Sequence, residues 1–305
     1  MKVQILLATY NGEKYIEEQL NSLLSQTYND FQILIRDDGS TDKTVSIIKN
    51  IAKKNEDKII IIEDNINCGN PTANFMQLMK NSDADYVMFC DQDDIWYPNK
   101  VEKSLECIKT LENKDTKVPC LIYTDYRVVG DDLNYIDKSN TQLDFKKLDF
   151  SHLLVQNYVT GCCMMINKAL CQIADNYDNR ILMHDWWLAL CAAGGGRIEH
   201  FPIVLMDYRQ HIGQNAGFED ISKLNYIFRK IFSSESRKSM CNYINQAEAL
   251  REKYYENLNS QNKLLLQIFL NIPKKKSKLK RIQELKRYEF VKNTTIRQLS
   301  QYWYI

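Results

Sequence analysis

Residues 85–94 read Asp-Tyr-Val-Met-Phe-Cys-Asp-Gln-Asp-Asp, an apolar run that ends in three carboxylates within four positions. The run from Asp85 to Cys90 has the length and composition of a buried β-strand. Carboxylates placed this closely repel one another, and burial beside a strand end adds to the cost. A cation held between them would remove the repulsion. The stretch therefore predicts both a strand and a charged site at its end.

Three more β-rich runs precede this strand, each separated from the next by a helical pattern. We expect strands at residues 3–8, 31–36 and 59–62, and helices over 13–26 and 45–52. Continuous apolar strands that alternate with helices predict a parallel sheet covered on both faces. Ligands of such sheets bind beyond the carboxyl ends of the strands. Three polar clusters lie at those ends and are expected to meet in one crevice: Thr9-Tyr10-Asn11, Asp37-Asp38 and Asp91 to Asp94.

The second half of the chain is less regular. We expect strands at 119–125, 160–166 and 197–206 and a helix at 184–193. From Asp220 onward the pattern is helical, and one long helix can carry an apolar face made of Ala247, Leu250, Tyr254, Leu258, Leu265 and Phe269. The fold expected is α/β, with a mostly parallel central sheet flanked by helices and a helical C-terminal extension.

Charge is distributed unevenly along the 305 residues. The formal net charge is +1, yet the segment 274–297 holds ten Lys and Arg against Glu284 and Glu289, a local excess of eight positive charges that leaves the remainder at about −7. Apolar residues interleave with these cations, namely Leu279, Ile282, Leu285, Tyr288 and Phe290. One interpretation is a basic amphipathic helix that lies on anionic lipid. The alternative is a solvated helix that packs on the body through its apolar stripe. A nucleic-acid partner is not expected, because the body is acidic and carries no binding motif for it.

The nine cysteines form no Cys-x-x-Cys pair and no metal-ligand spacing. Several lie within apolar runs, for example Cys90 and Cys191, as reduced buried thiols do. The N-terminal residues look like a first strand and not a secretory signal, and no apolar run has the length of a membrane span. We therefore expect a cytoplasmic protein, attached at most to the inner face of the cell membrane.

Asp91 and Asp93 can point at one place, since alternate residues of an extended segment share a face. All-oxygen ligation favours a hard ion, Mg²⁺ or Mn²⁺, which completes its shell with waters and substrate phosphates. The alternative is a solvated acidic turn that caps a helix starting near Pro98. The spacing of the two carboxylates leaves both open.

Residues 6–44, LLATYNGEKYIEEQLNSLLSQTYNDFQILIRDDGSTDKT, together with CDQDDIWYPNK at 90–100, resemble the nucleotide-binding half of an inverting glycosyltransferase of family 2 with the GT-A fold. The resemblance covers roughly the first two-thirds of the chain. It implies a glycosyltransferase domain at 1–218, with a nucleotide-binding half at 1–98 and an acceptor half at 99–218. Residues 219–305 form the helical C-terminal region.

The resemblance implies roles for the acidic clusters. The first loop, with Thr9, Tyr10, Asn11 and nearby Glu13, would hold the nucleoside of the donor. Asp38 would accept from a uracil or thymine imide, while the role of Asp37 stays undecided; the alternative for both is a turn that caps the next helix. Asp91 and Asp93 would contact ribose and metal, with Asp94 supporting them.

The acceptor side is expected from Met183-His184-Asp185-Trp186-Trp187. The family places its catalytic base in an acidic motif here, often Glu-Asp, and this chain has His-Asp. We assign Asp185 as the base and His184 as a neighbour that tunes it. The alternative makes Asp185 an acidic residue favoured by a helix N-terminus. The two tryptophans either stack on a sugar or belong to the core.

The segment Tyr208-Arg209-Gln210-His211-Ile212-Gly213-Gln214-Asn215 resembles the loop that closes on the diphosphate. Arg209 can pair with phosphate, and His211 is a candidate third metal ligand, although a lone His is usually not one. Thr160-Gly161 is a candidate lining of the acceptor pocket.

Together these motifs most resemble bacterial rhamnosyltransferases of cell-surface polysaccharide synthesis. The implied donor is dTDP-L-rhamnose, and the implied acceptor is a saccharide, free or on a polyprenyl diphosphate. Another donor, such as UDP-galactose or UDP-glucose, and a catalytically idle sugar-nucleotide-binding protein stay open. A nucleotidyltransferase is disfavoured because no Gly-rich phosphate loop is visible near Thr9, and a retaining glycosyltransferase has no clear match.

Overall fold

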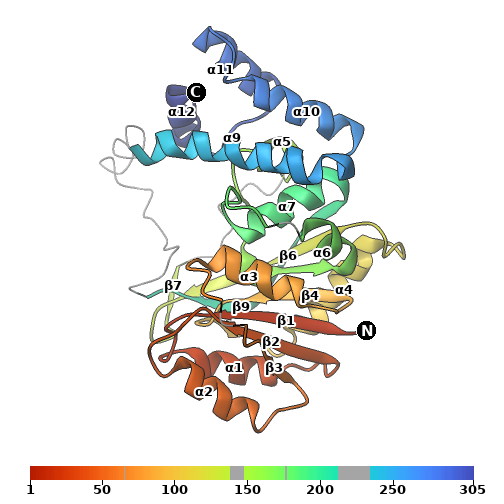
Figure 1. Ribbon diagram of the computed structural model, residues 1–305, viewed down its shortest axis with the longest axis vertical. Helices are drawn as coiled ribbons and strands as arrows, with labels where there is room; N and C mark the ends of the chain where they lie inside the picture. The colour runs from red at the N-terminus through yellow and green to blue at the C-terminus, as the bar shows by residue number, and fades with distance from the viewer. Residues whose placement is uncertain (65, 138–147, 176, 212–233) are drawn as a thin grey trace.

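A nine-stranded sheet crosses the part of the chain that the structure describes, residues 1–64, 66–137, 148–175, 177–211 and 234–305 of a computed structural model (Figure 1). The strand order is β3-β2-β1-β4-β8-β6-β9-β5, and β7 pairs with β6. The strands are β1 Val3–Thr9, β2 Phe31–Asp37, β3 Ile59–Ile61, β4 Tyr86–Cys90, β5 Ile95–Trp96, β6 Cys120–Val129, β7 Tyr135–Asp137, β8 Met164–Asn167 and β9 Arg197–Arg209. The helices of the body are α1 Ile16–Leu24, α2 Thr44–Ala52, α3 Pro71–Lys80, α4 Lys100–Glu112, α5 Phe150–Leu153, α6 Lys168–Ala174 and α7 His184–Gly195.

The first four strands by sequence form the parallel half of the sheet. β1 lies between β2 and β4, and Leu7 is level with both Ile35 and Cys90. The ends of these strands therefore coincide, and Thr9 is level with Asp37. The predicted parallel sheet is confirmed, and the polar clusters that follow its strands lie at one edge.

The other half of the sheet is mixed. β8 runs antiparallel to β4 and to β6, whereas β9 runs parallel to β6. The strand expected at 160–166 begins only at Met164, because Gly161–Cys163 form a 3₁₀ turn. That turn brings the chain back across the ends of the parallel strands.

Alternate residues of the strands feed two hydrophobic clusters, one on each face. Ile5, Leu7 and Ile33 point to the face covered by α1, α2 and α4. Leu6, Leu34 and Phe89 point to the face covered by α3, α6 and α7. Figure 1 shows α1 and α2 on the side of the sheet opposite α3 and α7. This two-sided cover explains why the strand sequences are almost uniformly apolar.

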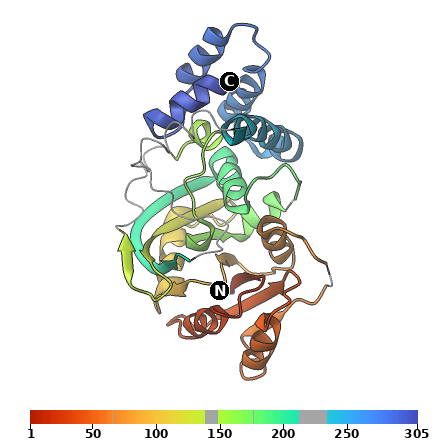
Figure 2. The ribbon, with the colours of Figure 1, turned by 90° about the vertical axis from the view of Figure 1, so that its left-hand side faces the viewer.

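The C-terminal region consists of α9 Ser234–Tyr254, α10 Ser260–Asn271, α11 Lys278–Arg287 and α12 Thr295–Tyr304, stacked beyond α7 (Figure 2). The single long helix expected here is wrong, because the chain turns after Tyr254 and Asn259 caps α10 by accepting from the Asn262 N–H. The domain boundary expected at 218 and the helical start expected at Asp220 fall within 212–233, outside the described residues.

The basic segment is not one helix either. α11 ends at Arg287, Glu289 adopts a positive φ of 56°, and Thr294 caps α12. Leu285 and Phe290 are fully buried in the cluster that includes the sheet. The segment thus packs on the body through Leu285 and Phe290, as the alternative interpretation expected, whereas Leu279 is 73% exposed. Among the described residues, no helix is both long and apolar enough to cross a bilayer.

Candidate active site

The loops after β1 and β2 are joined by hydrogen bonds at the edge of the sheet. The Thr9 hydroxyl donates to Asp37 Oδ2 at 2.8 Å, and Asp37 Oδ1 accepts from the backbone N–H groups of Gly39 and Ser40. Thr9 is buried, so its side chain supports the loop. Asp37, undecided from sequence, holds the turn.

Asn11 and Glu13 link the same two loops further out. Asn11 adopts a left-handed φ of 48°, and its Oδ1 accepts from the Thr41 N–H at 2.8 Å. Glu13 Oε2 accepts from the Lys43 N–H at 2.9 Å. Tyr10 is 55% exposed. Of the predicted nucleoside-binding residues, Tyr10, Asn11 and Glu13 are exposed, whereas Thr9 is buried.

Asp38 is buried and its carboxylate is occupied by groups of the protein. Oδ1 accepts from Cys68 N–H at 2.6 Å and from Arg36 Nη1 at 3.3 Å, while Oδ2 accepts from Gly69 N–H at 2.9 Å. These bonds fix the loop between β3 and α3 beside the first two loops. Both carboxylate oxygens of Asp38 already accept hydrogen bonds from the protein. The role predicted for Asp38, binding of a nucleobase imide, therefore stays a prediction.

Gln92, which the sequence motifs did not single out, joins the acidic segment to the first loop. Its Oε1 accepts from the Tyr10 N–H at 2.9 Å, and its Nε2 donates to the Tyr10 carbonyl at 3.0 Å. A Cβ at Gly12 would lie 2.4 Å from Gln92 Oε1, so only glycine allows this close approach. The Gln92 side-chain amide pairs with both backbone polar groups of Tyr10, as a backbone amide does in a β-bridge. The sequence signal that could have identified it is an amide residue placed between two carboxylates.

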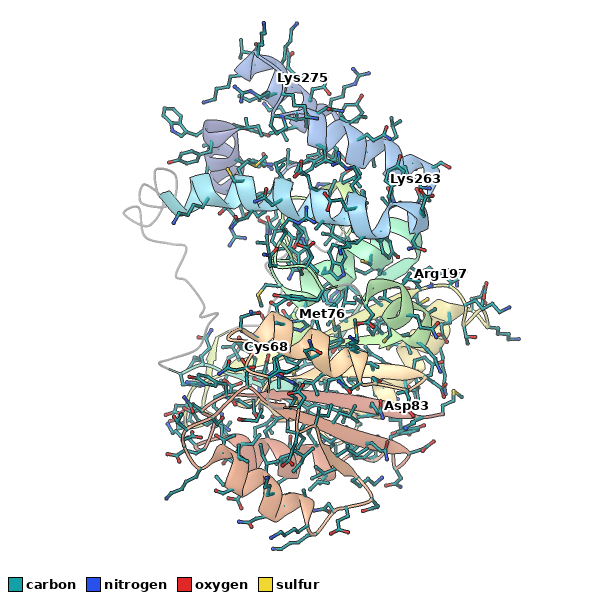
Figure 3. All side chains as sticks on the ribbon, in the orientation of Figure 1. Cys68, Met76, Asp83, Arg197, Lys263 and Lys275 are labelled. Carbon is teal, nitrogen blue, oxygen red and sulfur yellow. The ribbon has the colours of Figure 1, made fainter. Side chains whose placement is uncertain are left out.

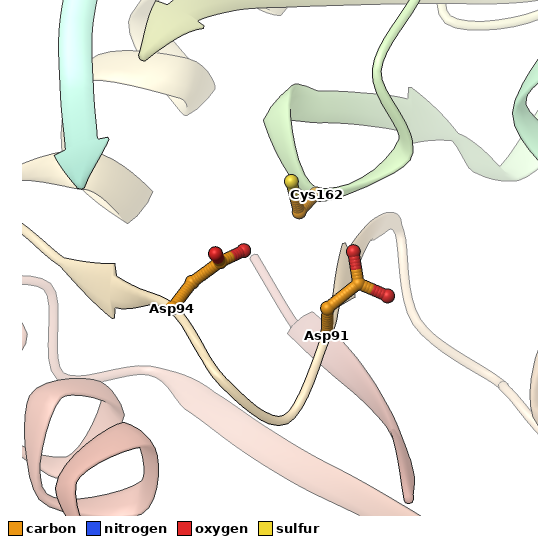
Figure 4. Close-up of side chains that lie close together, drawn as sticks. All are labelled: Asp91, Asp94 and Cys162. Atoms are coloured by element: carbon orange, nitrogen blue, oxygen red, sulfur yellow. The ribbon is translucent and has the colours of Figure 1, made fainter. Parts of the chain in front are cut away.

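The three carboxylates after β4 occupy different positions. Asp94 is completely buried, and its Oδ1 accepts from the backbone N–H of Arg209 at 3.2 Å. Asp91 lies beside it, and Figure 4 shows both carboxylates directed toward Cys162. Burial raises the pKa of Asp91 to about 7, helped by the charges of Asp93 and Asp185. Burial likewise raises the pKa of Asp94 well above its usual range. Asp94 is buried and Asp91 and Asp93 are half-buried, and the N-cap residue of α4 is Asn99, so these carboxylates do not form the solvated helix cap of the alternative interpretation.

His211 and Arg209 both reach this cluster from the end of β9. His211 Nε2 lies 2.8 Å from Asp93 Oδ2, and its ring packs 4.5 Å from that of Tyr15. The Arg209 guanidinium is buried and donates to Glu18 Oε2 at 2.6 Å and to the carbonyls of Asp93 and Asp131. Arg209 thus fastens the acidic loop to α1, and its predicted pairing with a phosphate stays a prediction.

Asp185 lies at the N-terminus of α7, next to the acidic cluster. Its Oδ1 accepts from Asn157 Nδ2 at 3.0 Å and its Oδ2 from the Gly161 N–H at 3.1 Å. Burial raises its pKa to about 6 in spite of these bonds. Its negative charge in turn contributes to the raised pKa of Asp91. The candidate base and the candidate donor-binding acid therefore share one site.

His184 points away from solvent and cannot act as a charged partner of Asp185. Burial lowers its pKa to about 3, and its ring packs against Phe75 and Phe89 at centroid distances of 4.2 and 5.2 Å. A Cβ at Gly161 would lie 2.6 Å from His184 Nε2, so Gly161 makes room for this ring. Trp186 and Trp187 are buried and donate to the carbonyls of Leu153 and Ala174. They belong to the core.

The donor set fits a hard divalent cation. The carboxylates of Asp91, Asp93 and Asp94 are close enough for their charges to interact, and Asp94 Oδ2 is buried without a hydrogen-bond partner among the described residues. Carboxylates whose pKa values are raised by mutual repulsion and burial regain their charged form when a cation neutralises them. Such a site, at the carboxyl edge of a parallel sheet and beside a carboxylate of raised pKa, can bind a diphosphate and remove a proton from a second substrate.

The mostly parallel sheet and its flanking helices define a fold of the GT-A type. Solved structures share this fold: residues 1–349 of Staphylococcus aureus TarS in complex with UDP-GlcNAc match with a TM-score of 0.60 at 18% identity, covering 94% of this chain and 80% of that one. The mannosyltransferase PcManGT from Pyrobaculum calidifontis, in complex with GDP-Man and Mn²⁺, matches with a TM-score of 0.57 at 16% identity, covering 94% and 72%.

The sequence profile of glycosyl transferase family 2 matches residues 4–173, and the chain belongs to that family. An uncharacterized glycosyltransferase of Rickettsia conorii is 34% identical over 169 residues, which is 54% of this chain and only 26% of the relative's length. The dTDP-rhamnosyl transferase RfbG of Shigella flexneri is 29% identical over 263 residues, or 76% of this chain and 82% of the relative.

Proposed function

We propose that the chain is an inverting, cation-dependent glycosyltransferase that moves L-rhamnose from dTDP-L-rhamnose to a saccharide acceptor, free or on a polyprenyl diphosphate, in cell-surface polysaccharide synthesis. The observation that carries the proposal is the closeness of Asp185 to Asp91, which is near enough for one charge to raise the pKa of the other. An acceptor-side base and a donor-side acid are the two groups that a single displacement needs.

The reaction is one displacement. The acceptor hydroxyl oxygen attacks the anomeric carbon of the donor sugar while the bond from that carbon to the diphosphate oxygen breaks. Asp185 takes the hydroxyl proton, and the nucleoside diphosphate leaves with the bonding electron pair. With a pKa of about 6, Asp185 is mostly deprotonated at neutral pH and is still basic enough to take up a proton.

Binding of the donor falls to the three joined loops. Tyr10, Asn11 and Glu13 of the first loop, with the buried Thr9 and Asp38, would hold the nucleoside, and the buried Arg209 would pair with the diphosphate. Asp91, Asp93 and His211 would hold Mg²⁺ or Mn²⁺ beside the diphosphate. A bound cation supplies positive charge that stabilises the leaving diphosphate. The structure of PcManGT, a fold neighbour, is a complex with GDP-Man and Mn²⁺.

The choice of rhamnose rests on the likeness to RfbG, which extends over most of both chains. The neighbours of known structure are complexes with other donors, UDP-GlcNAc and GDP-Man, so UDP-hexoses are the alternative donors. A chain that binds a donor without turnover is the second alternative.

The test is a donor panel of dTDP-L-rhamnose, UDP-glucose, UDP-galactose, UDP-GlcNAc and GDP-mannose, with released nucleotide measured in Mn²⁺, in Mg²⁺ and in EDTA. We expect release from dTDP-L-rhamnose that EDTA abolishes. If release is fastest from a UDP-hexose, the proposed donor is wrong and the proposed transfer reaction stands. Binding of a donor without any release, insensitive to EDTA, would favour the idle binding protein. If no donor binds in the presence of Mn²⁺, the proposal that the chain is a glycosyltransferase is wrong.

We also propose that the basic C-terminal surface, Lys274, Lys276, Lys278, Lys280, Lys286 and Arg287, attaches the enzyme to the cytoplasmic face of the membrane that carries its acceptor. All six residues are exposed. Leu279 of α11 and Trp303 of α12 are 73% and 56% exposed. Lys278 Nζ is 5.0 Å from the centre of the Trp303 ring. Exposed apolar groups among cations are the composition that binds anionic lipid surfaces.

A further inference from the structure

The thiol of Cys162 lies within the acidic cluster, although the cation set expected from the sequence contains no sulfur. Ligand atoms of Asp91, Asp94 and Cys162, one from each, all lie within 4.8 Å of one another, and the three side chains face a common space (Figure 4). Two ligands of one ion can be up to about 4.4 Å apart, given metal–oxygen and metal–sulfur bonds of about 2.1 and 2.3 Å. Small side-chain rotations would therefore place all three on a single cation.

Asp94 supplies an independent indication of a ligand. Its side chain is 0% exposed, and its Oδ2 has no hydrogen-bond partner within the described part of the chain. A buried carboxylate oxygen without a partner is costly, and buried charges in proteins are normally paired or bound to metal. The oxygen belongs to the carboxylate that faces Cys162 and Asp91.

A divalent ion would offset most of the negative charge of the cluster. Two carboxylates and a thiolate carry three negative charges, and Asp93, whose charge raises the pKa of both carboxyls, adds a fourth. Lys100 is completely buried and donates to the carbonyl oxygen of Cys162 at 2.6 Å, which places one positive charge at the same turn. A divalent cation would leave a single excess negative charge, whereas without it the cluster can lose its excess charge only by holding protons.

We propose that Asp91, Asp94 and Cys162 form the inner half of the cation site, with mixed oxygen and sulfur ligands. This inference rests on the proposed function, because both assign Asp91 to the cation. It adds Asp94 and Cys162 as ligands and changes which divalent cation the site is expected to prefer. The thiol loses its proton to solvent when the cation binds, because only the thiolate is a ligand. A sulfur ligand favours borderline cations such as Co²⁺ and Zn²⁺ over Mg²⁺.

The test is a Co²⁺ titration of the whole chain followed by near-ultraviolet absorption, where a sulfur-to-cobalt charge-transfer band reports a thiolate ligand. We expect the band in the unsubstituted protein, its loss in Cys162→Ser, and its retention in Cys191→Ser. Cys191 is the matched control because it is also a completely buried thiol, and burial alone, with no charge of the acidic cluster, raises its pKa. Asp94→Asn should weaken Co²⁺ binding at least tenfold.

Each outcome separates this inference from the proposed function. If the unsubstituted protein binds Mn²⁺ and shows EDTA-sensitive turnover but no charge-transfer band with Co²⁺, the inner site is wrong and the glycosyltransferase proposal stands. A band that persists in Cys162→Ser would overturn the inference too, because another thiol would be the ligand. If no cation binds, with or without dTDP, both the inner site and the cation-dependent reaction fail. Absence of the band in the unsubstituted protein would overturn the inference even if a variant does not fold.

Discussion

At the scale of single residues, Asp185 is the side chain on which turnover should depend most directly. We expect Asp185→Asn to lower kcat by about 10²- to 10⁴-fold, because general base catalysis contributes that much, while the donor Kd changes by less than about threefold. The amide keeps the shape of the carboxylate, but it can accept from only one of Asn157 Nδ2 and the Gly161 N–H, because its other terminal atom is a donor. The measurement is single-turnover transfer together with donor binding by calorimetry. An equal loss of both would take Asp185 out of the base role.

The same residue fixes the direction of the pH dependence. A base must be deprotonated to act, and burial raises the pKa of Asp185 to about 6. Turnover of the unsubstituted enzyme should therefore be steady above that pH and fall roughly tenfold for each unit below it. The residual turnover of Asp185→Asn should lack this acid limb. A limb that survives in Asp185→Asn would belong to another group.

The buried carboxyl of Asp94 is expected to lower the stability of the folded protein as pH rises. Burial raises the pKa of its carboxyl in the folded protein, so the folded state holds its proton more tightly than the unfolded state. The contribution of such a group to stability falls as pH rises from the unfolded pKa through the folded one. In EDTA, Asp94→Asn should therefore raise Tm by a few degrees, about 2–8 °C, and by more at pH 8 than at pH 5.

Asp93→Asn is the matched control for this measurement, because Asp93 Oδ2 is paired with His211 Nε2 at 2.8 Å. Loss of a paired carboxylate should lower Tm or leave it unchanged. A lower Tm for Asp94→Asn in EDTA would show that the buried carboxylate is stabilised by groups of the protein alone.

The sequence could predict which residue types gather at the site and not how each is used. Asp91, Asp93, Asp185 and His211 are brought together as expected. Arg209 was expected to face a phosphate, yet its guanidinium donates to Glu18, which lies 191 positions away along the chain. Its other acceptors are backbone carbonyls that a motif does not encode. Cys162 is a further case, because only the 3₁₀ turn before β8 brings its thiol to the carboxylates.

At the scale of elements, Gln92 makes the loop after β1 and the loop after β4 act as one unit. Its amide forms two hydrogen bonds with Tyr10, and each is worth about 1 kcal/mol. Gln92→Ala should therefore raise the KM for donor roughly tenfold, while kcat stays within about threefold. Initial-rate kinetics over donor concentration give both values.

Gln92→Glu is the control variant for the two hydrogen bonds between Gln92 and Tyr10, because it should remove only one of them. A carboxylate still accepts from the Tyr10 N–H and no longer donates to the Tyr10 carbonyl, so the rise in KM should be intermediate. If kcat falls while KM is unchanged, the contact serves the displacement and not donor binding.

Sequence periodicity succeeded for the elements that cover the sheet and failed where loops interrupt a helical pattern. α1, α2 and α7 lie within or close to the helices expected at 13–26, 45–52 and 184–193. The helical face drawn from Ala247 to Phe269 continues in register across the break at Asn259, so periodicity alone could not find the cap. The tail failed in the same way: a left-handed residue after the last turn is a common helix stop, but here it is Glu289, whereas the sequence signal for such a stop is Gly or Asn.

At the scale of the whole molecule, the C-terminal helices and one face of the sheet share a single hydrophobic cluster. Leu6 and Phe89 of the sheet belong to it, and so do Leu266 of α10 and Phe290 before α12. The helices are therefore held rigidly against the catalytic body, with Lys275 at the end of the molecule opposite α1 and α2 (Figure 3). A surface bound there would hold the active site at a fixed distance from the membrane.

This geometry leads to the last prediction, on vesicle binding. The full chain should sediment with vesicles that contain anionic phospholipid and not with pure phosphatidylcholine, and binding should weaken as salt rises. Each cation near such a surface contributes about 1 kcal/mol, so replacing Lys274, Lys276 and Lys280 by Glu should reduce partitioning at least 100-fold. These three lysines are exposed and lie beyond α10, away from the catalytic cluster, so turnover on a water-soluble acceptor should not change. Charge reversal of Lys49, Lys53 and Lys54 near α2, at the opposite end of the molecule, is the matched control and should leave vesicle binding intact. Equal losses in both triple variants would mean that vesicle binding follows net charge and that the C-terminal surface has no special part in it.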